Sequence, residues 1–202
     1  MNKKGIFLVS LNSKKLDHFL DNEYPLTIDN NLTELDLLVF DNFETLNGIF
    51  FNDRNVNNQN NLLEDIIERV KTQIVATNKE KRNFIRFTEK NRELNQYILA
   101  VYKEYYSNAS FKRHCKSQIF QNLQPKLRDL NITNHKSNLI ELIAPFLIAE
   151  IALYLYIFSM EYYQIIFGFE NEMGIIADIK NGKYPSFNIF IKQKTDYQKV
   201  EF

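Results

Sequence analysis

Glycine and cysteine are scarce in this 202-residue chain, and each shortage excludes a class of site. The five glycines form no phosphate-cradling loop, which excludes a nucleotide-binding fingerprint. The single cysteine, Cys115, excludes an internal disulfide framework. The histidines His18, His114 and His135 are scattered without metal-ligand spacing, so we expect no metal site and no cofactor. The nucleophile-elbow sequence of serine hydrolases is also missing.

The amino terminus, Met1–Ser10, becomes polar too soon for a signal peptide, which predicts a cytoplasmic protein. A content of 45% hydrophobic residues suits one domain over residues 1–202. Only the run Leu142–Met160 approaches the roughly 20 residues that a membrane span requires. Because Pro145 and Glu150 interrupt it, we interpret it as the central helix of a soluble fold, with a membrane-associated protein as one alternative.

Charge is balanced overall but separated along the chain. Acids dominate from Asp17 to Asp65, where Arg54 is the only basic residue. Bases dominate from Arg69 to Arg92, and five more follow without an acid between them: Lys112, Arg113, Lys116, Lys126 and Arg128. Clustered bases attract phosphates whatever the net charge, so the pattern indicates a polyanionic partner. A solvated helix surface would give the same pattern.

Apolar runs and their spacing predict an α/β fold of the Rossmann type, with a parallel sheet and helices on its faces. The expected strands are Gly5–Ser10, Leu35–Asp41, Phe84–Phe87, Tyr163–Phe167 and Phe187–Ile191. The expected helices span residues 11–20, 62–74, 91–106, 139–160 and 172–180, and the last is closed by Asn181–Gly182. A further helix is expected to begin at an N-cap, Ser110, and to run toward Pro125. Residues 52–61 form an asparagine-rich loop.

Two residues stand out as candidates for chemistry. Ser10 closes the first strand, at the sheet edge where parallel folds bind ligands, although a serine there also suits a turn. Glu150 lies in an otherwise apolar helix, where an ionisable group is costly unless it is paired, neutralised or used. A satisfied core carboxylate, a polar contact between helices and a general acid or base all remain open for it.

The succession of segments through nearly the whole chain resembles the tRNA-dependent cyclodipeptide synthases. The segments that carry the resemblance are Gly5–Ser13, Leu37–Asp41, Asn95–Tyr97 with Tyr106–Cys115, and Phe146–Ala152. The resemblance implies a Rossmann-like domain similar to the catalytic domain of class I aminoacyl-tRNA synthetases, without the use of ATP. It also implies an enzyme that takes two aminoacyl-tRNAs and forms a cyclic dipeptide (a diketopiperazine).

Under this resemblance, Ser10 matches the nucleophile that carries an aminoacyl ester. Glu150 matches the glutamate that binds the substrate's amino group and helps to move protons. Asn12, Ser13, Phe146 and Phe167 fall at substrate-binding positions, in a pocket that Phe7, Val9, Leu38 and Phe40 also line. The residues expected to hold tRNA phosphates are Lys79, Lys81, Arg82, Arg86, Lys90 and Arg92. We expect a monomer without an obligate protein partner.

Several positions depart from the family pattern, including Leu11–Ser13, where the family tends to have a glycine and then a polar residue after the serine. Phe146 stands where the family usually has a tyrosine, four residues before the glutamate, and Phe167 falls at a second tyrosine position. Tyr184–Pro185 resembles the tyrosine-proline pair of one subgroup, but it lies too far toward the carboxyl terminus. The missing hydroxyls motivate an alternative function, a catalytically impaired homologue that binds aminoacyl-tRNA or another RNA.

Overall fold

A computed structural model describes residues 4–9, 34–39, 64, 65, 68, 72, 81–86, 91–129, 136–160, 162, 164–168 and 174–192. The chain divides into two compact units. Unit 1 comprises Met1–Asn91, Tyr162–Asn171 and Thr195–Phe202, and unit 2 comprises Arg92–Glu161 and Glu172–Lys194. The expectation of one domain over the whole chain stays a prediction.

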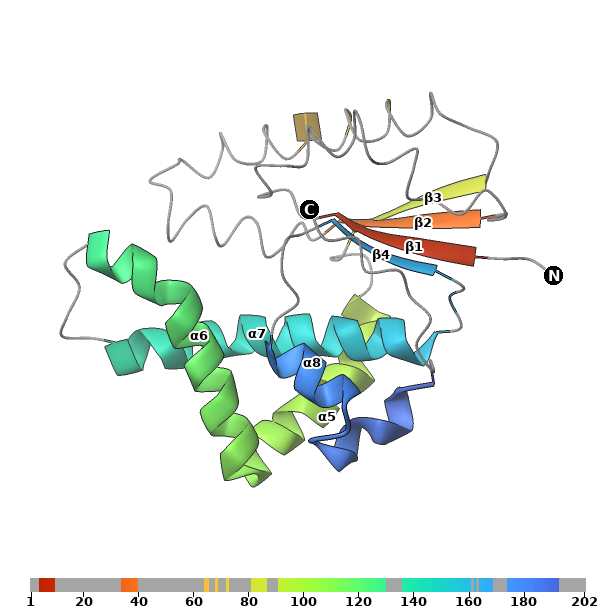
Figure 1. Cartoon of the computed structure of the whole chain (residues 1–202). Coiled ribbons are helices and arrows are strands. Elements are labelled where there is room, and N and C mark those ends of the chain that lie inside the picture. Colours follow the sequence, from red (N-terminus) through yellow and green to blue (C-terminus); the bar gives the residue numbers. More distant parts are fainter. Residues whose placement is uncertain are drawn as a thin grey trace. The chain divides into compact units, whose positions relative to one another are not determined.

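Unit 1 contains a parallel sheet of four strands in the order β3-β2-β1-β4 (Figure 1). The strands are β1 (Lys4–Val9), β2 (Glu34–Val39), β3 (Lys81–Arg86) and β4 (Gln164–Gly168). Ile6 and Leu8 on β1, Leu38 on β2 and Ile165 on β4 are at most 1% exposed. Because alternate residues of a strand share one face, Ile6 and Leu8 belong to one buried face of the sheet.

The predictions of the first, second and fourth of these strands are confirmed to within one or two residues. The third begins at Lys81 rather than Phe84, because Lys81–Asn83 pairs in register with Glu34–Asp36. Backbone pairing needs no apolar side chain, so the charged start of β3 gave no hydrophobic signal.

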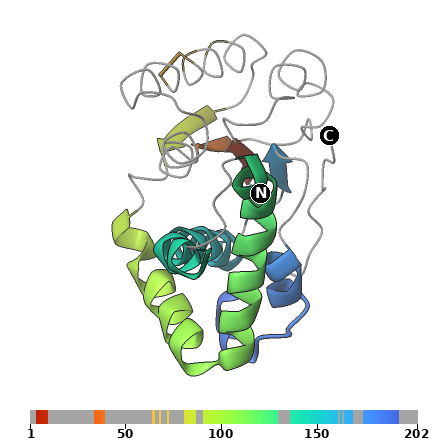
Figure 2. The ribbon, with the colours of Figure 1, turned by 90° about the vertical axis from the view of Figure 1, so that its left-hand side faces the viewer.

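Unit 2 contains four helices and a short 3-10 helix among its described residues. They are α5 (Asn91–Ser107), α6 (Ala109–Asp129), α7 (Lys136–Ser159), α8 (Gly174–Lys180) and η3 (Pro185–Phe190). α7 contacts both α6 and η3, and α6 contacts α8. Figure 2 looks along α7 and shows α6 beside it. The central helix that the sequence predicts is therefore confirmed as the core helix of this unit.

The carboxyl-terminal half of α7 is mostly buried, and its final turns are buried on nearly all sides. Ile151, Ala152, Leu153, Tyr154 and Leu155 are each at most 1% exposed. Within the described residues, Ser137–Ser159 is the one segment long and apolar enough to cross a membrane, and 56% of its most apolar window is buried against protein. This burial is what a core helix of a folded unit shows.

A hydrogen-bond chain ties α5 to the end of α7. The Ser159 hydroxyl donates to the Tyr156 carbonyl at 2.7 Å, so the Tyr97 hydroxyl is the donor in its own 2.7 Å bond to Ser159 Oγ. The Tyr97 ring also packs edge-on against Tyr156, with centroids 5.8 Å apart, and at a tilt against Phe190 of η3, with centroids 5.1 Å apart. One buried tyrosine thus joins three elements of unit 2.

The predicted N-cap at Ser110 is wrong, because Asn108 caps α6. Asn108 Oδ1 accepts from the backbone N–H groups of Ser110 and Phe111 at 3.0 and 3.1 Å. Asparagine is among the best N-cap residues because its side-chain oxygen satisfies N–H groups that lack a helical partner. α6 also continues through Pro125 to Asp129, beyond the predicted end.

The predicted late strand at Phe187–Ile191 is also wrong, since Pro185–Phe190 forms η3. α8 ends as predicted at Asn181–Gly182, where Gly182 adopts φ +76°. Gly182 N–H donates to Ile179 O and Lys183 N–H to Asp178 O, both at 3.0 Å, which is a Schellman motif. Pro185 then stands at the start of η3, where its missing N–H costs nothing.

Several predictions fall on residues outside those described. They include the helix over 11–20, the loop over 52–61 and most of the helix over 62–74. Glu64, Asp65, Glu68 and Thr72 are helical and exposed, in agreement with the last of these.

Candidate active site

The carboxyl ends of the four strands meet at one edge of the sheet. Val9 pairs with Val39 and with Gly168, and Val39 pairs with Arg86, so all four strands finish level. Ligands of parallel sheets bind at this edge. Ser10 directly follows β1 in the sequence, but Ser10, Asn12, Ser13 and Phe40 lie outside the described residues, and their roles stay predictions.

Glu150 lies on a half-buried stripe of α7. Ile143, Phe146 and Glu150 recur at spacings of three and four residues, which places them on one face of the helix, and all three are half-buried. Ile148 and Ile151, close to Glu150 in the sequence, are at most 1% exposed. The carboxylate therefore sits at the border between the apolar interior of unit 2 and a less buried face.

Phe146 lies on α7 one helical turn before Glu150, as predicted. Because it is a phenylalanine, it brings no hydroxyl to this position. The second departure, Phe167, lies on β4, where it pairs with Leu8 in the sheet register. Leu38, another predicted pocket residue, is 1% exposed on β2. Phe7 and Val9 belong to β1, and their place in the pocket stays a prediction.

The predicted phosphate-binding residues are divided between elements. Lys81, Arg82 and Arg86 belong to β3, which has only β2 beside it in the described sheet. Arg92 is exposed in the first turn of α5. Lys79 and Lys90 lie outside the described residues. Whether these six residues act together on a polyanion stays a prediction.

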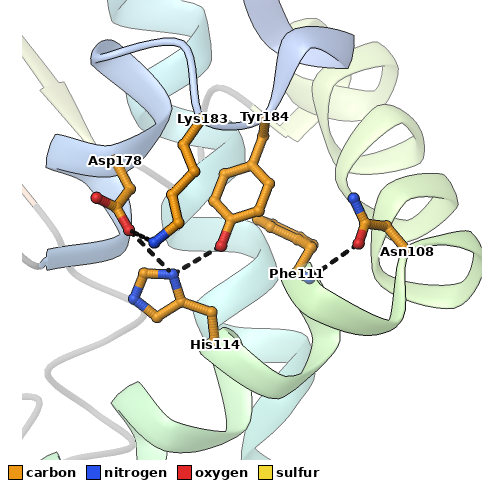
Figure 3. A network of polar contacts seen from close by, with 6 residues as sticks. All are labelled: Asn108, Phe111, His114, Asp178, Lys183 and Tyr184. Atoms are coloured by element: carbon orange, nitrogen blue, oxygen red, sulfur yellow. Dashed lines mark hydrogen bonds and ion pairs between the residues drawn. The ribbon is translucent and has the colours of Figure 1, made fainter.

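A polar network that the sequence did not reveal joins α6 to the segment after α8 (Figure 3). His114 Nδ1 lies 2.8 Å from the Tyr184 hydroxyl and 3.4 Å from Asp178 Oδ2, which also pairs with the Lys183 ammonium. Burial lowers the pKa of His114, with Asp178 opposing the change and Lys183 adding to it. Burial also raises the pKa of Tyr184. At neutral pH the network therefore holds a neutral imidazole and a neutral phenol.

A second polar junction joins three helices. The Tyr105 hydroxyl donates to Glu141 Oε2 at 3.4 Å, and the Lys116 ammonium pairs with Glu141 Oε1. The hydrogen bond from Lys116 is the main cause that lowers the pKa of Glu141. Burial raises the pKa of Tyr105 above its usual value, with Glu141 adding to it, and raises the pKa of neighbouring Cys115 to about 12. A protonated, buried Cys115 is a packing residue and not a nucleophile.

Unit 1 holds a buried carboxylate that sequence reasoning missed. Asp36 is 2% exposed in the middle of β2, pairs with the Lys4 ammonium at 2.8 Å and accepts from the Tyr162 hydroxyl at 3.1 Å. These residues lie toward the amino-terminal ends of the strands, away from the ligand-binding edge. Their contacts indicate a role in fixing the sheet. Across the described ranges, no three or more His, Cys, Asp or Glu side chains gather in a metal-binding group.

No family model matches this sequence, and no curated protein matches it. Solved structures do match. A cyclodipeptide synthase from Fluoribacter dumoffii has a TM-score of 0.66 at 14% identity, over 91% of this chain and 85% of that one. A cyclodipeptide synthase from Bacillus thermoamylovorans has a TM-score of 0.64 at 14% identity, over 99% of this chain and 88% of that one. A cyclodipeptide synthase from Staphylococcus haemolyticus has a TM-score of 0.63 at 16% identity, over 99% of this chain and 90% of that one.

The chain has the cyclodipeptide synthase fold. The resemblance noted in the sequence is thereby confirmed at the level of fold, although the sequence identity is low. Identities of 14–16% carry no residue roles, so the functions of Ser10 and Glu150 do not follow from this likeness. The cyclodipeptide synthase fold covers both units, because the matches span at least 91% of the chain.

Proposed function

We propose that this chain is an aminoacyltransferase of the cyclodipeptide synthase family, which joins the aminoacyl groups of two aminoacyl-tRNAs into a cyclic dipeptide. The observation that carries the proposal is the likeness of fold over 91–99% of the chain to structures that bear the cyclodipeptide synthase name. The proposal includes a Rossmann-like domain that resembles class I aminoacyl-tRNA synthetases. It also includes a single functional domain, a cytoplasmic location and a monomer that needs no cofactor.

Ser10 is the proposed nucleophile. Its hydroxyl attacks the ester carbonyl of the first aminoacyl-tRNA, an aminoacyl-serine ester forms, and the tRNA 3′ oxygen leaves with the proton that the serine gives up. The amine of the second aminoacyl-tRNA then attacks the serine ester, which forms a peptide bond and restores the serine hydroxyl. Finally, the free amine of the dipeptide attacks its own tRNA ester and closes the ring. Every acyl group arrives activated, so positioned groups suffice for the chemistry.

Glu150 is the proposed anchor for the substrate ammonium and a relay for its protons. A carboxylate beside apolar residues such as Ile148 and Ile151 attracts an ammonium more strongly than one in water, because the local dielectric constant is lower. An amine must lose a proton before it attacks a carbonyl, and a nearby carboxylate can accept that proton. The half-buried position of Glu150 on α7 suits a group that meets substrate at one side.

The remaining predicted residues would select and hold the substrates. Asn12, Ser13, Phe146 and Phe167 are proposed to contact the aminoacyl groups, and a phenylalanine at 146 favours an apolar side chain. The bases at 79, 81, 82, 86, 90 and 92 are proposed to contact tRNA phosphates, which position the acceptor end and read little sequence.

Intact-mass measurement tests the proposal. We expect incubation with aminoacyl-tRNA to add the mass of one aminoacyl group, and Ser10→Ala to abolish the adduct. Ser117→Ala, on the exposed face of α6, is the matched control and should retain it. Glu150→Gln should suppress the diketopiperazine in the product mixture, whereas Glu141→Gln on the same helix should not. Normal product from Ser10→Ala would show that the serine route is wrong.

A second function, RNA binding without catalysis, is favoured by one observation. Phe146 occupies the turn before Glu150 without a hydroxyl. Of the later tyrosines, Tyr154 and Tyr184 are 1% and 2% exposed, so neither is presented at a surface. Retention of tRNA by a protein whose mass stays unmodified would support this function.

A further inference from the structure

One face of α5 leaves large apolar side chains in solvent. Leu99 is 69% exposed, Tyr106 is 73% exposed, and Tyr102 between them is partly exposed. Positions 99, 102 and 106 recur at spacings of three and four residues, which aligns them as one stripe on the helix. Scattered exposed apolar residues are ordinary, but an aligned stripe that contains two aromatic rings indicates a binding surface.

The two rings of this stripe are held in a defined geometry. Tyr102 and Tyr106 are parallel, with an interplanar angle of 7° and centroids 6.2 Å apart. The Tyr105 ring, 1% exposed, meets Tyr106 edge-on at 5.3 Å and 87°. Because the Tyr105 hydroxyl is bonded to Glu141 on α7, the ring that supports Tyr106 is itself anchored. Tyr106 is therefore a preorganised flat surface rather than a free rotor.

A lysine ammonium lies close to the same rings. The Lys112 ammonium lies 5.0 Å from the centroid of the Tyr105 ring and 5.3 Å from that of Tyr106. Arg113 follows it, and α6 contains no acid before Asp129, its last residue. Of two carboxylates on these helices, Glu141 is paired with the Lys116 ammonium, and Glu104 accepts a hydrogen bond from Asn108 Nδ2 at 2.6 Å.

We propose that this Tyr102–Tyr106–Lys112 platform binds unpaired nucleotides of RNA, with a base stacked on the exposed Tyr106 ring and phosphates held by Lys112 and Arg113. Aromatic rings combined with a basic surface are the means by which proteins bind single strands without reading sequence, since every base has a flat face. α6, which contains no acid before Asp129, favours a polyanion over a neutral or basic protein surface.

The proposal rests on the proposed function in one respect, the identity of the RNA as tRNA. The platform lies on the Glu141 side of α7, because Tyr105 bonds to Glu141. Glu141 and Glu150 are nine residues apart, which is about two and a half helical turns, so they point from opposite faces. The platform therefore contacts a part of the tRNA other than the aminoacyl group that Glu150 would receive.

Fluorescence anisotropy with a labelled single-stranded RNA octanucleotide tests the platform directly. Tyr106→Ala should weaken binding about tenfold, the loss expected for one stacked base. Tyr106→Phe keeps the ring and should bind within about twofold of the unmodified protein. Ile189→Ala, a 76% exposed apolar residue on η3, is the matched surface control and should also leave binding unchanged.

Salt dependence separates the phosphate contact from the stacking. Lys112→Ala should reduce the slope of log affinity against log salt concentration by about 0.7, the value for one phosphate contact with a single strand. Tyr106→Ala should leave that slope unchanged. A fully paired RNA duplex of the same length should lose little affinity in Tyr106→Ala, because its bases are already stacked.

Three results divide the possibilities. Single-strand affinity that is unchanged in Tyr106→Ala would overturn the platform, even in a chain that makes a diketopiperazine. A Tyr106→Ala variant that loses RNA binding would support the platform, even in a chain that makes no diketopiperazine, where only the proposed function fails. A dimer that Tyr106→Ala dissociates without any change in RNA affinity would make the stripe an interface between copies and overturn the proposal.

Discussion

The hydroxyl of Tyr184 offers a test of how α6 is held against the segment after α8. Tyr184 is 2% exposed, and its ring packs edge-on against Phe111 with centroids 4.9 Å apart. Tyr184→Phe would keep this packing and remove only the oxygen, which lies 2.8 Å from His114 Nδ1. A hydrogen bond between neutral groups contributes about 1 kcal/mol to stability. The His114 side chain is 24% exposed, so water can replace the lost partner and the cost should stay near that value.

Urea unfolding followed by circular dichroism measures this cost. We expect Tyr184→Phe to lower the free energy of unfolding by about 1 kcal/mol. A double-mutant cycle with His114→Ala should give a coupling of about 1 kcal/mol, because either change alone breaks the same bond. Tyr106→Phe, which removes an exposed hydroxyl, is the control and should change stability by less than about 0.5 kcal/mol. A coupling near zero would refute the contact between Tyr184 and His114.

The same contact predicts the direction of a pH dependence. Burial lowers the pKa of His114 in the folded state below the value of about 6.5 that the unfolded chain has. Between these two values the unfolded state binds more protons, so stability rises with pH. The neutral His114 imidazole makes its full contribution to the free energy of unfolding above pH ~6.5. This contribution is lost as the pH falls through the folded-state pKa of His114. His114→Gln should remove this part of the dependence of the urea midpoint on pH.

Three further substitutions test contacts elsewhere. Lys4→Met should lower the free energy of unfolding by about 2 kcal/mol, because the buried Asp36 carboxylate loses a charged partner at 2.8 Å. Urea denaturation measures this loss. An unchanged urea midpoint would show that the Lys4–Asp36 pair does not contribute to stability. Asn108→Ala should cost about 1 kcal/mol through loss of the α6 cap, whereas Ser110→Ala should cost less than about 0.5 kcal/mol; equal effects would contradict the cap assignment. Gly182→Ala should lower the free energy of unfolding, measured by thermal denaturation, by about 1 kcal/mol because alanine disfavours a positive φ. Steric clash should add nothing, since an added Cβ would lie 4.0 Å from its nearest neighbour. A stabilised variant would argue against the positive φ at this position.

The sequence predicts those helices and strands that are marked by an apolar run within their own residues. The strands at Lys4–Val9 and Glu34–Val39 and the helix at Lys136–Ser159 are apolar runs of suitable length, and each is found close to its predicted bounds. The segment Pro185–Phe190 has the composition of a strand but forms η3. Proline fixes its first backbone angle, and Phe187 packs against Phe111 with centroids 5.3 Å apart, so tertiary contact outweighs β-propensity.

The polar contacts are less predictable because they join distant positions. His114 and Tyr184 are 70 residues apart, and Asp36 and Tyr162 are 126 apart. No spacing rule for one helix or strand connects such pairs. Asp36 offered one signal, a charge in the middle of an otherwise apolar strand, which is the same signal that singled out Glu150.

The arrangement of Tyr184 bears on how far the family pattern extends. A tyrosine-proline pair stands at Tyr184–Pro185, yet here the proline begins η3 and the tyrosine hydroxyl bonds to His114. This pair therefore has a structural use that needs no substrate, which agrees with its position too far toward the carboxyl terminus. If Tyr184→Phe lowers stability but leaves product formation intact, the Tyr184 hydroxyl has no part in the proposed reaction.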